Sequence, residues 1–348
     1  MIVGLDVGYY KTAVAVSGSR QCFPGNQAQR GELQTVLFES VACKYVESLM
    51  SVHRASASML VRFQGDDTEY AVGQSAIDRS GLLINEESER WIESQIWRIL
   101  ALAALGQVSH ATRVDLDVVV GLPISTIQND GAIEHVRAVL NGSHSIKLGD
   151  RGSWQKLEVR VVRVVPQPFG CVLDRVLDDR GTMRDQDLAR GRFGVLDVGG
   201  GTTQVLTVQR LQDLPDRRGS MKRGGLYVAR LVRQWLRHNC PGLELSDFEI
   251  SRAIVAGHVF YYGDQVDLTP AINAARETFG EAVVAFCASY WGEGADLDRV
   301  FLCGGAQAMV AGTLAERYQH AETVPDPQLA NVRGFLKYGL FLSRQSSY

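Results

Sequence analysis

Two stretches of this sequence, 191 residues apart, share one order of residue types. Residues 4–14, "GLDVGYYKTAV", and residues 195–205, "VLDVGGGTTQV", each pass from apolar residues through Leu-Asp-Val-Gly into a short turn and a second apolar run. This pattern predicts a β-hairpin in each half of the chain, with Asp6 or Asp197 near the end of its first strand. Glycine inside a strand costs about 0.5–1 kcal/mol in lost order. A run of three glycines therefore indicates that another group approaches the backbone at the turn.

Both turns have the composition of a phosphate-binding loop. Successive N–H groups of such a turn point into a concavity that binds phosphate oxygens, and the hydroxyls of Thr12, Thr202 and Thr203 would add donors. Asp6 and Asp197 would hold Mg²⁺, which binds through one or two carboxylates together with phosphates and water. The matched pair predicts a nucleotide triphosphate held in a cleft between two domains. A pair of ordinary glycine hairpins is the alternative.

The rest of the chain alternates predicted strands with predicted helices, as in an α/β protein. Apolar spacing predicts helices over residues 91–103, 127–140, 170–179, 226–239 and 271–293, and strands over 114–121, 145–149, 156–166 and 298–303. The polar stretch 180–192 is expected to be a loop. The last strand runs into Gly304 and Gly305.

Length and composition limit the class of protein. A chain of 348 residues favours two domains. Its net charge of −3 gives no excess of positive charge for a nucleic-acid or membrane surface, and no apolar run reaches the 18 or so residues of a membrane span. The six cysteines are scattered and the seven histidines are well separated, so we expect reduced thiols, no histidine metal site and a cytoplasmic location. The five tryptophans, Trp91 among them, are expected in the core.

Four motifs in one order resemble the superfamily of actin, the sugar kinases and the heat-shock chaperone ATPases. They are Asp6–Thr12, "VVPQPFGCVLD" (164–174), Asp197–Thr203 and "VFLCGGAQ" (300–307). The C-terminal "PDPQLANVRGFLKYGL" (325–340) is more narrowly similar to the bacterial and archaeal plasmid-segregation actins of the ParM and StbA type. In those proteins an Asn-x-Arg-Gly-Phe helix packs back onto the first domain.

The resemblance implies a fold and its domains. It implies two related actin-like α/β domains with mixed sheets flanked by helices and a nucleotide cleft between them. Domain I would comprise residues 1–166 and 328–348, with a small subdomain near 30–80. Domain II would comprise residues 167–327, with a small subdomain near 212–268.

The resemblance also implies catalytic residues. Gln167 occupies the position of a glutamate in segregation actins and of a glutamine in eukaryotic actin, beside the metal-holding Asp6 and Asp197. An amide is a negligible base, so Gln167 would position the attacking water rather than take its proton. Many relatives have a lysine where this chain has Ala13; Lys11, two residues earlier on the same strand face, would reach the phosphates instead. A plain polar Gln167 and a solvated Lys11 are the alternatives.

The nucleotide-binding residues implied by the resemblance fall into three groups. The two loops contribute their backbone and polar side chains. Gly304 and Gly305 resemble the pair on which a flat adenine lies, and the stretch 222–225 falls where relatives contact ribose and adenine. A helix entry with solvated basic residues is the alternative for the stretch before residue 226. The full set is Gly8, Tyr9, Tyr10, Lys11, Thr12, Gly199, Gly200, Gly201, Thr202, Thr203, Lys222, Gly224, Gly225, Gly304, Gly305 and Gln307.

Three functions remain open. The first is an ATPase, with GTP as an alternative substrate, that uses Mg²⁺ and polymerises head to tail to move plasmid or other DNA through a DNA-bound adaptor, without direct nucleic-acid or membrane binding. Aromatic residues of the small subdomains would anchor its contacts: Tyr45, Phe248, Tyr261 and Tyr262. The second is a metabolite kinase, for which Asp174 is the best candidate catalytic aspartate. The third is a nucleotide-binding scaffold with little turnover, favoured by the lack of Glu at 167 and Lys at 13.

Overall fold

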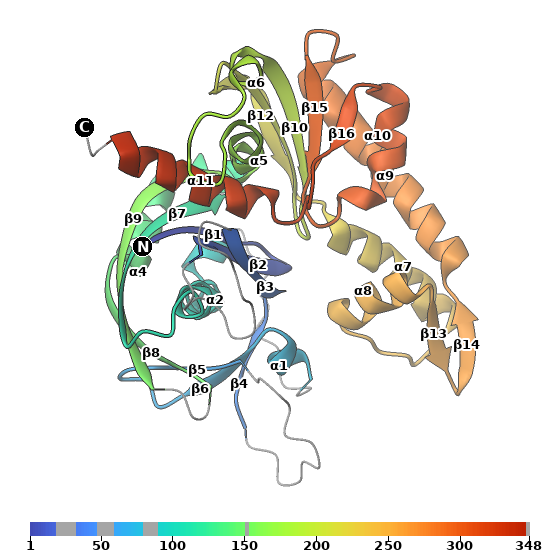
Figure 1. The fold of residues 1–348 in the computed structure, drawn as a ribbon. Coiled ribbons are helices and arrows are strands. Elements are labelled where there is room, and N and C mark those ends of the chain that lie inside the picture. Colours follow the sequence, from blue (N-terminus) through green and yellow to red (C-terminus); the bar gives the residue numbers. More distant parts are fainter. Residues whose placement is uncertain (19–32, 47–58, 79–89, 150–152, 346–348) are drawn as a thin grey trace. The chain divides into compact units, whose positions relative to one another are not determined.

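The computed structural model describes residues 1–18, 33–46, 59–78, 90–149 and 153–345. Its contacts divide the chain into two compact units. Unit 1 comprises Met1–Ala189 with Leu329–Tyr348, and unit 2 comprises Arg190–Gln328. Each unit is a mixed β-sheet with helices packed on it (Figure 1).

Unit 1 is built on a nine-stranded sheet in the order β3-β2-β1-β7-β9-β8-β5-β6-β4. The strands β1, β7 and β9 run parallel, and the rest of the sheet is antiparallel. β3 and the group β4–β6 lie at opposite ends of this one sheet, so the described part of the predicted subdomain near 30–80 has no sheet of its own. The bounds are β1 (Ile2–Val7), β2 (Lys11–Ser17), β3 (Leu33–Glu39), β4 (Ala42–Lys44), β5 (Leu60–Phe63), β6 (Glu69–Val72), β7 (Arg113–Leu122), β8 (Gly142–Leu148) and β9 (Trp154–Pro166).

Helices cover both faces of this sheet. On one face α2 (Gln95–Gly106), apolar almost all round and buried, packs on β1 and β2, and α4 (Ala132–Leu140) packs on β9. On the other face α11 (Ala330–Gln345) crosses β1, β2 and β7 beside α5 (Gln167–Val176) (Figure 1). The short helices are α1 (Gln74–Ile77), η1 (Trp91–Glu93), α3 (Ile124–Ile127) and α6 (Gln186–Arg190), the last within the stretch predicted as a loop.

Small residues let α11 lie directly on the sheet. A Cβ at Gly4 would come within 2.4 Å of the Val332 carbonyl oxygen, and one at Gly334 within 1.8 Å of the Gly170 oxygen. The predicted packing of the C-terminal helix onto the first domain therefore depends on glycines at both contacts. The same packing places α5 in unit 1, whereas the sequence-based boundary after residue 166 places it in domain II.

Unit 2 has a five-stranded sheet in the order β12-β11-β10-β15-β16 and a separate hairpin, β13–β14. β12 belongs to the central sheet, so the predicted subdomain near 212–268 begins after this strand. The bounds are β10 (Arg192–Val198), β11 (Thr203–Gln209), β12 (Gln212–Met221), α7 (Gly225–Asn239), α8 (Asp247–Ala256), β13 (His258–Tyr261), β14 (Asp264–Asp267), α9 (Thr269–Trp291), β15 (Arg299–Cys303), η2 (Gln307–Met309), α10 (Ala311–Arg317) and β16 (Ala321–Thr323).

The two units repeat one strand pattern. The run β3-β2-β1-β7-β9 of unit 1 has the same order and the same strand directions as β12-β11-β10-β15-β16 of unit 2. The hairpin registers also match, with Val7 opposite Thr12 and Val198 opposite Thr203. The prediction of two related α/β units with mixed sheets and flanking helices is confirmed.

Two further expectations concern cysteines and membranes. Cys43, Cys171, Cys240, Cys287 and Cys303 are buried free thiols, and Cys22 lies outside the described residues. Among the described residues, no helix is both long enough and apolar enough to cross a bilayer.

Candidate functional site

The first predicted loop joins β1 to β2 in a tight hairpin. The amide of Gly8 donates to the Lys11 carbonyl oxygen at 3.0 Å, which closes the turn. Asp6 is the penultimate residue of β1; it is half-buried and lies opposite Gly121 on the parallel strand β7. Gly8, Tyr9 and the following residue of the turn are partly exposed, so their backbone can reach a ligand.

The second loop joins β10 to β11 with the same geometry. The amide of Gly199 donates to the Thr202 carbonyl oxygen at 2.9 Å, which matches the bond of Gly8 residue for residue. The glycines from Gly199 to Gly201 and Thr202 are partly exposed. Asp197 is more deeply placed than its counterpart Asp6, with 4% of its surface exposed.

Unit 2 brings the predicted adenosine residues against this second loop. The amides of Gly225 and Leu226, at the start of α7, donate to the carbonyl oxygens of Gly199 and Gly200, each at 2.9 Å. A Cβ at Gly224 would lie 2.5 Å from both of those oxygens. The turn after β15 also packs on this loop, because the Ala306 amide donates to the Val198 carbonyl oxygen at 2.9 Å. Three motifs far apart in the sequence therefore meet here.

That turn begins with Gly304, which has a left-handed backbone (φ +90°). A Cβ at Gly304 would lie 2.4 Å from the Asp197 carboxylate, so only glycine fits. The neighbouring Gly305 lies against the side chain of Gln328, and Gln307 accepts a bond from the Thr323 hydroxyl at 3.4 Å.

Two of the three predicted threonine donors are already used within the protein. Thr12 is fully buried, and its hydroxyl shares a hydrogen bond with the Ser40 hydroxyl at 2.8 Å. The buried Thr203 hydroxyl donates to the Arg223 carbonyl oxygen at 2.7 Å. In this structure both hydroxyls therefore have partners within the protein, and their donation to phosphate stays a prediction.

Lys11 forms an ion pair rather than projecting as a solvated turn lysine. Its ammonium nitrogen lies 2.6 Å from a Glu39 carboxylate oxygen and 5.9 Å from the centre of the Tyr10 ring. Glu39 ends β3, directly opposite Lys11 in the sheet. Nothing in the spacing of these residues along the sequence identifies Glu39 as the partner.

Gln167 contacts Asp6 across 161 residues of sequence. Pro166 precedes the helix α5, Gln167 is its first residue, and the buried side-chain amide donates to the Asp6 carboxylate at 2.6 Å. The alternative of a plain polar residue before a proline does not describe this contact. This bond fixes the orientation of the Gln167 side chain beside the Asp6 carboxylate.

Asp174, the candidate aspartate of the kinase hypothesis, is buried in an ion-pair cluster. Its carboxylate lies 2.8 Å from a guanidinium nitrogen of Arg333 and 2.9 Å from the ammonium of Lys337, two residues on one face of α11. The two cations and the carboxylate join α5 to α11. This structural role gives no support to the kinase alternative, for which Asp174 was the best candidate.

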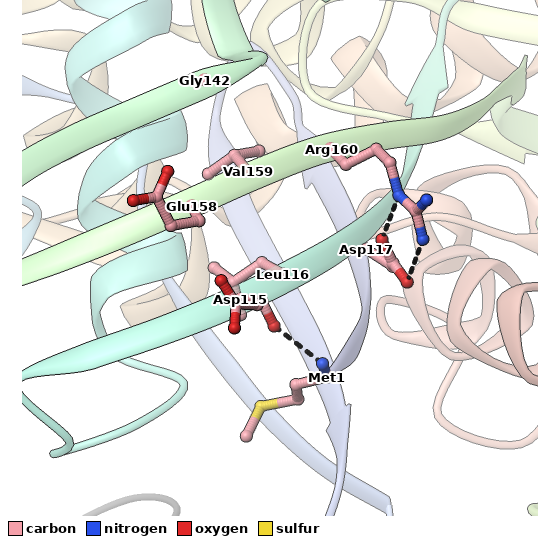
Figure 2. Close-up of a pocket in the computed structure, with 8 residues that line it drawn as sticks. All are labelled: Met1, Asp115, Leu116, Asp117, Gly142, Glu158, Val159 and Arg160. Carbon is pink, nitrogen blue, oxygen red and sulfur yellow. Dashed lines mark hydrogen bonds and ion pairs between the residues drawn. The ribbon is translucent and has the colours of Figure 1, made fainter.

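A pocket of about 300 Å³ lies at the other end of the unit 1 strands (Figure 2). It is lined by Met1, Asp115, Leu116, Asp117, Gly142, Glu158, Val159 and Arg160. Ile2 pairs with Asp117 and Asp6 with Gly121, so the pocket lies about four residues, or roughly 13 Å, from Asp6 and farther from the loop that follows it. This hollow is separate from the loops. Among the described residues, no group of three or more His, Cys, Asp or Glu is arranged to hold a metal ion.

Two family models cover both halves of the chain. The model for the actin-like proteins N-terminal domain matches residues 4–170, and that for the archaeal actin homologue MreB-like C-terminal domain matches residues 195–316. The chain belongs to the actin-like proteins. The two matched segments of this actin-like protein contain its first loop with Gln167, and its second loop with Gly304, respectively. The predicted membership of the actin superfamily is confirmed.

Solved structures support the same fold. A 15-stranded ParM filament from Clostridium botulinum aligns with a TM-score of 0.77 and 18% identity over 97% of this chain and 98% of that one. An archaeal actin homologue, Ta0583, in complex with ADP aligns at 0.76 and 18% over 97% and 98%. Bacillus thuringiensis ParM with AMPPNP aligns at 0.68 and 12% over 98% of both chains. A search of curated proteins found no match.

Proposed function

We propose that this actin-like protein binds Mg-ATP through its two loops, hydrolyses it, and assembles head to tail into filaments. The observation that carries the proposal is the repeated hairpin: the same register, the same Gly-to-carbonyl bond and an aspartate at the same position in both units. Similar structures contain ADP or AMPPNP, and one is a filament.

The residues present fit a magnesium nucleotide. Partly exposed glycines leave room for phosphate oxygens at both turns, and a Cβ at Gly224 or Gly304 would intrude on the second loop. Asp6 and Asp197 supply the carboxylate oxygens that Mg²⁺ prefers. When bound, the ion would neutralise charge on the phosphates. Lys222, Gly225 and Gly305 are proposed for the nucleoside, because they lie next to the second loop or in the turn that packs on it.

Gln167 is proposed to position the attacking water. Its amide nitrogen is held on the Asp6 carboxylate at 2.6 Å, so the side chain has a fixed orientation beside the first loop. Gln167 accepts no proton from the water in this role, and its contribution is to orient the water for attack.

Self-association is proposed through the tip of unit 2. Val255 and Tyr262 are about 90% exposed, and Phe260 is also exposed, all on α8 and the β13–β14 hairpin. Phe248, predicted to be exposed, is instead buried on the inner face of α8. Head-to-tail contacts that do not close into a ring produce open filaments. Transport of plasmid or other DNA through a DNA-bound adaptor in the cytoplasm is the proposed use of such filaments.

Light scattering tests the proposal. Purified protein with Mg-ATP is expected to scatter above a sharp critical concentration, to do so little with ADP, and to release phosphate as scattering decays. Calorimetry on the same sample measures nucleotide binding separately. ATP binding without any polymer would instead favour the scaffold hypothesis, which the Lys11–Glu39 ion pair and the glutamine at 167 already support.

A further inference from the structure

The first loop is supported by a tryptophan that lies 84 residues away in sequence. Trp91 begins η1, and its indole N–H donates to the Val7 carbonyl oxygen at 3.1 Å. The same peptide unit carries the N–H of Gly8, which donates to Lys11. Both polar ends of the Val7–Gly8 peptide are therefore bonded, and its plane is fixed at the point where the loop begins.

A second contact joins the same two segments. The ring of Tyr9 stacks on the ring of Trp91, with centroids 5.1 Å apart and planes inclined by 25°. Trp91 is buried, and the hydroxyl of Ser94 donates to its carbonyl oxygen at 2.6 Å while capping α2. The tryptophan is thus anchored in the core and contacts the loop through both its N–H and its ring.

In the second loop a backbone amide makes the hydrogen bond that the Trp91 indole makes in the first. Val198 corresponds to Val7 in the repeated hairpin, and its carbonyl oxygen accepts a bond from the backbone amide of Ala306 at 2.9 Å. Unit 2 therefore satisfies this carbonyl with the main chain, and unit 1 satisfies it with one side chain. A backbone donor survives any substitution except proline, whereas the donor of unit 1 is lost with a single residue.

We propose that Trp91 is a positioning residue for phosphate binding by the first loop. By fixing the Val7–Gly8 peptide and the Tyr9 ring, it sets the direction of the loop N–H groups that follow. The inference rests on the proposed function, since it concerns the same nucleotide. It identifies the indole of Trp91 as an internal reporter of nucleotide binding, because that ring contacts the loop directly.

The test compares two tryptophans that undergo the same chemical change. Trp91→Phe removes the indole donor while keeping a ring. Trp291→Phe is the matched control, because Trp291 is equally buried and its indole donates at 3.0 Å to the Thr207 hydroxyl in β11, away from either turn. Mg-ATP affinity measured by calorimetry is expected to fall about fivefold to tenfold in Trp91→Phe, the factor expected from one hydrogen bond, and less than twofold in the control.

Tryptophan fluorescence provides a second measurement, and a general loss of stability does not alter which tryptophan responds to Mg-ATP. Wild type and Trp291→Phe are expected to change their emission on addition of Mg-ATP, and Trp91→Phe is expected to lose most of that change. Tyr9→Leu removes the stacked ring without touching the core tryptophan, and is expected to weaken affinity as well. It keeps the test informative if Trp91→Phe does not fold.

Equal affinity losses in Trp91→Phe and Trp291→Phe would overturn the inference, as would unchanged affinity in both Trp91→Phe and Tyr9→Leu. In those cases wild type still binds ATP and the proposed function stands. Failure of the wild type to bind Mg-ATP would contradict the proposed function itself.

Discussion

The two loops of this protein share a register and an aspartate, yet they are supported in different ways. The second loop is supported by the main chain, through the amides of Gly225, Leu226 and Ala306. The first has one such main-chain bond, from the Ser40 amide to the Tyr10 carbonyl oxygen at 2.9 Å, and otherwise depends on side chains: the indole of Trp91, the carboxylate of Glu39 and the hydroxyl of Ser40. The difference teaches that one geometry can be reached by different means, and that each means has its own weakness. A side-chain atom added at Gly224 or Gly304 would disturb the second loop. Loss of a side-chain group, such as the indole of Trp91, would disturb the first.

The largest expected effect comes from the carboxylates that the two loops share. Asp197→Asn is expected to weaken Mg-ATP binding by more than about 100-fold, beyond the 10–100-fold typical of losing a residue that only supports a metal ligand. Asp247→Asn, which loses an ion pair with Arg233 in the same unit, is the control and should bind normally. Calorimetry with and without Mg²⁺ measures both.

Asp6→Asn sharpens this comparison, because Asp6 also anchors Gln167. If Asp6 binds the ion as Asp197 does, the two variants lose affinity alike. If Asp6 serves mainly to hold the glutamine, Asp6→Asn binds Mg-ATP but turns over slowly, and the functional symmetry of the loops is refuted.

The next effect concerns turnover. Gln167→Ala is expected to slow phosphate release by about 10²–10³-fold, as when one preorganised catalytic contact is lost, with ATP affinity nearly unchanged. Gln155→Ala is a matched control, since Gln155 is also a buried glutamine of unit 1 and its amide donates to the Ala111 carbonyl oxygen. Unchanged turnover in Gln167→Ala would show that another group positions the water.

Both loops were predictable from the sequence, and the supports of the first were not. Turn residues and apolar alternation are local signals, so the positions of Asp6 and Asp197 and the hairpin register follow from short stretches. Trp91 and Glu39 reach the first loop only through tertiary packing, which single-sequence periodicity does not encode. The contacts that support the second loop were easier to anticipate, because two backbone segments can approach this closely only where a residue has no side chain. Gly224 is such a residue, and glycine is visible in the sequence.

Two further structural roles had signals in the sequence. Arg333 and Lys337 are four residues apart on the C-terminal helix, a spacing that places two cations on one face, and there they pair with the buried Asp174. Phe248, Ile250, Ala253 and Ile254 are all buried on α8. These residues lie on one side of an amphipathic helix, and that pattern in the sequence predicts a buried Phe248.

A third effect tests the weakness of the second loop. Gly304→Ala adds a methyl group 2.4 Å from the Asp197 carboxylate at φ +90°, so the turn must move. The variant is expected to lose about 1–3 kcal/mol of unfolding free energy and to bind Mg-ATP about tenfold or more weakly. Gly312→Ala is the control, because a Cβ at this position in α10 would meet no atom of another element within 4 Å. If Gly304→Ala and Gly312→Ala have equal thermal midpoints and equal Mg-ATP affinities, the second loop is not especially sensitive to an added side-chain atom.

The smallest expected effect belongs to the ion pair of the first loop. Lys11 is held by Glu39 in this structure, and it can reach a phosphate only by leaving that partner. Glu39→Gln removes the competing charge, and pairs as exposed as this one contribute about 0.2–1 kcal/mol, so Mg-ATP affinity should rise about 1.5-fold to fivefold. The increase in affinity should shrink with added salt, because the attraction between the Lys11 ammonium and the phosphates is electrostatic. Glu158→Gln, which loses a pairing with Lys156 at 2.9 Å by the separate pocket, is the control and should change nothing. A decrease in affinity in Glu39→Gln would show that Glu39, like Trp91, supports the loop in its binding conformation, and that Lys11 does not transfer to the phosphates.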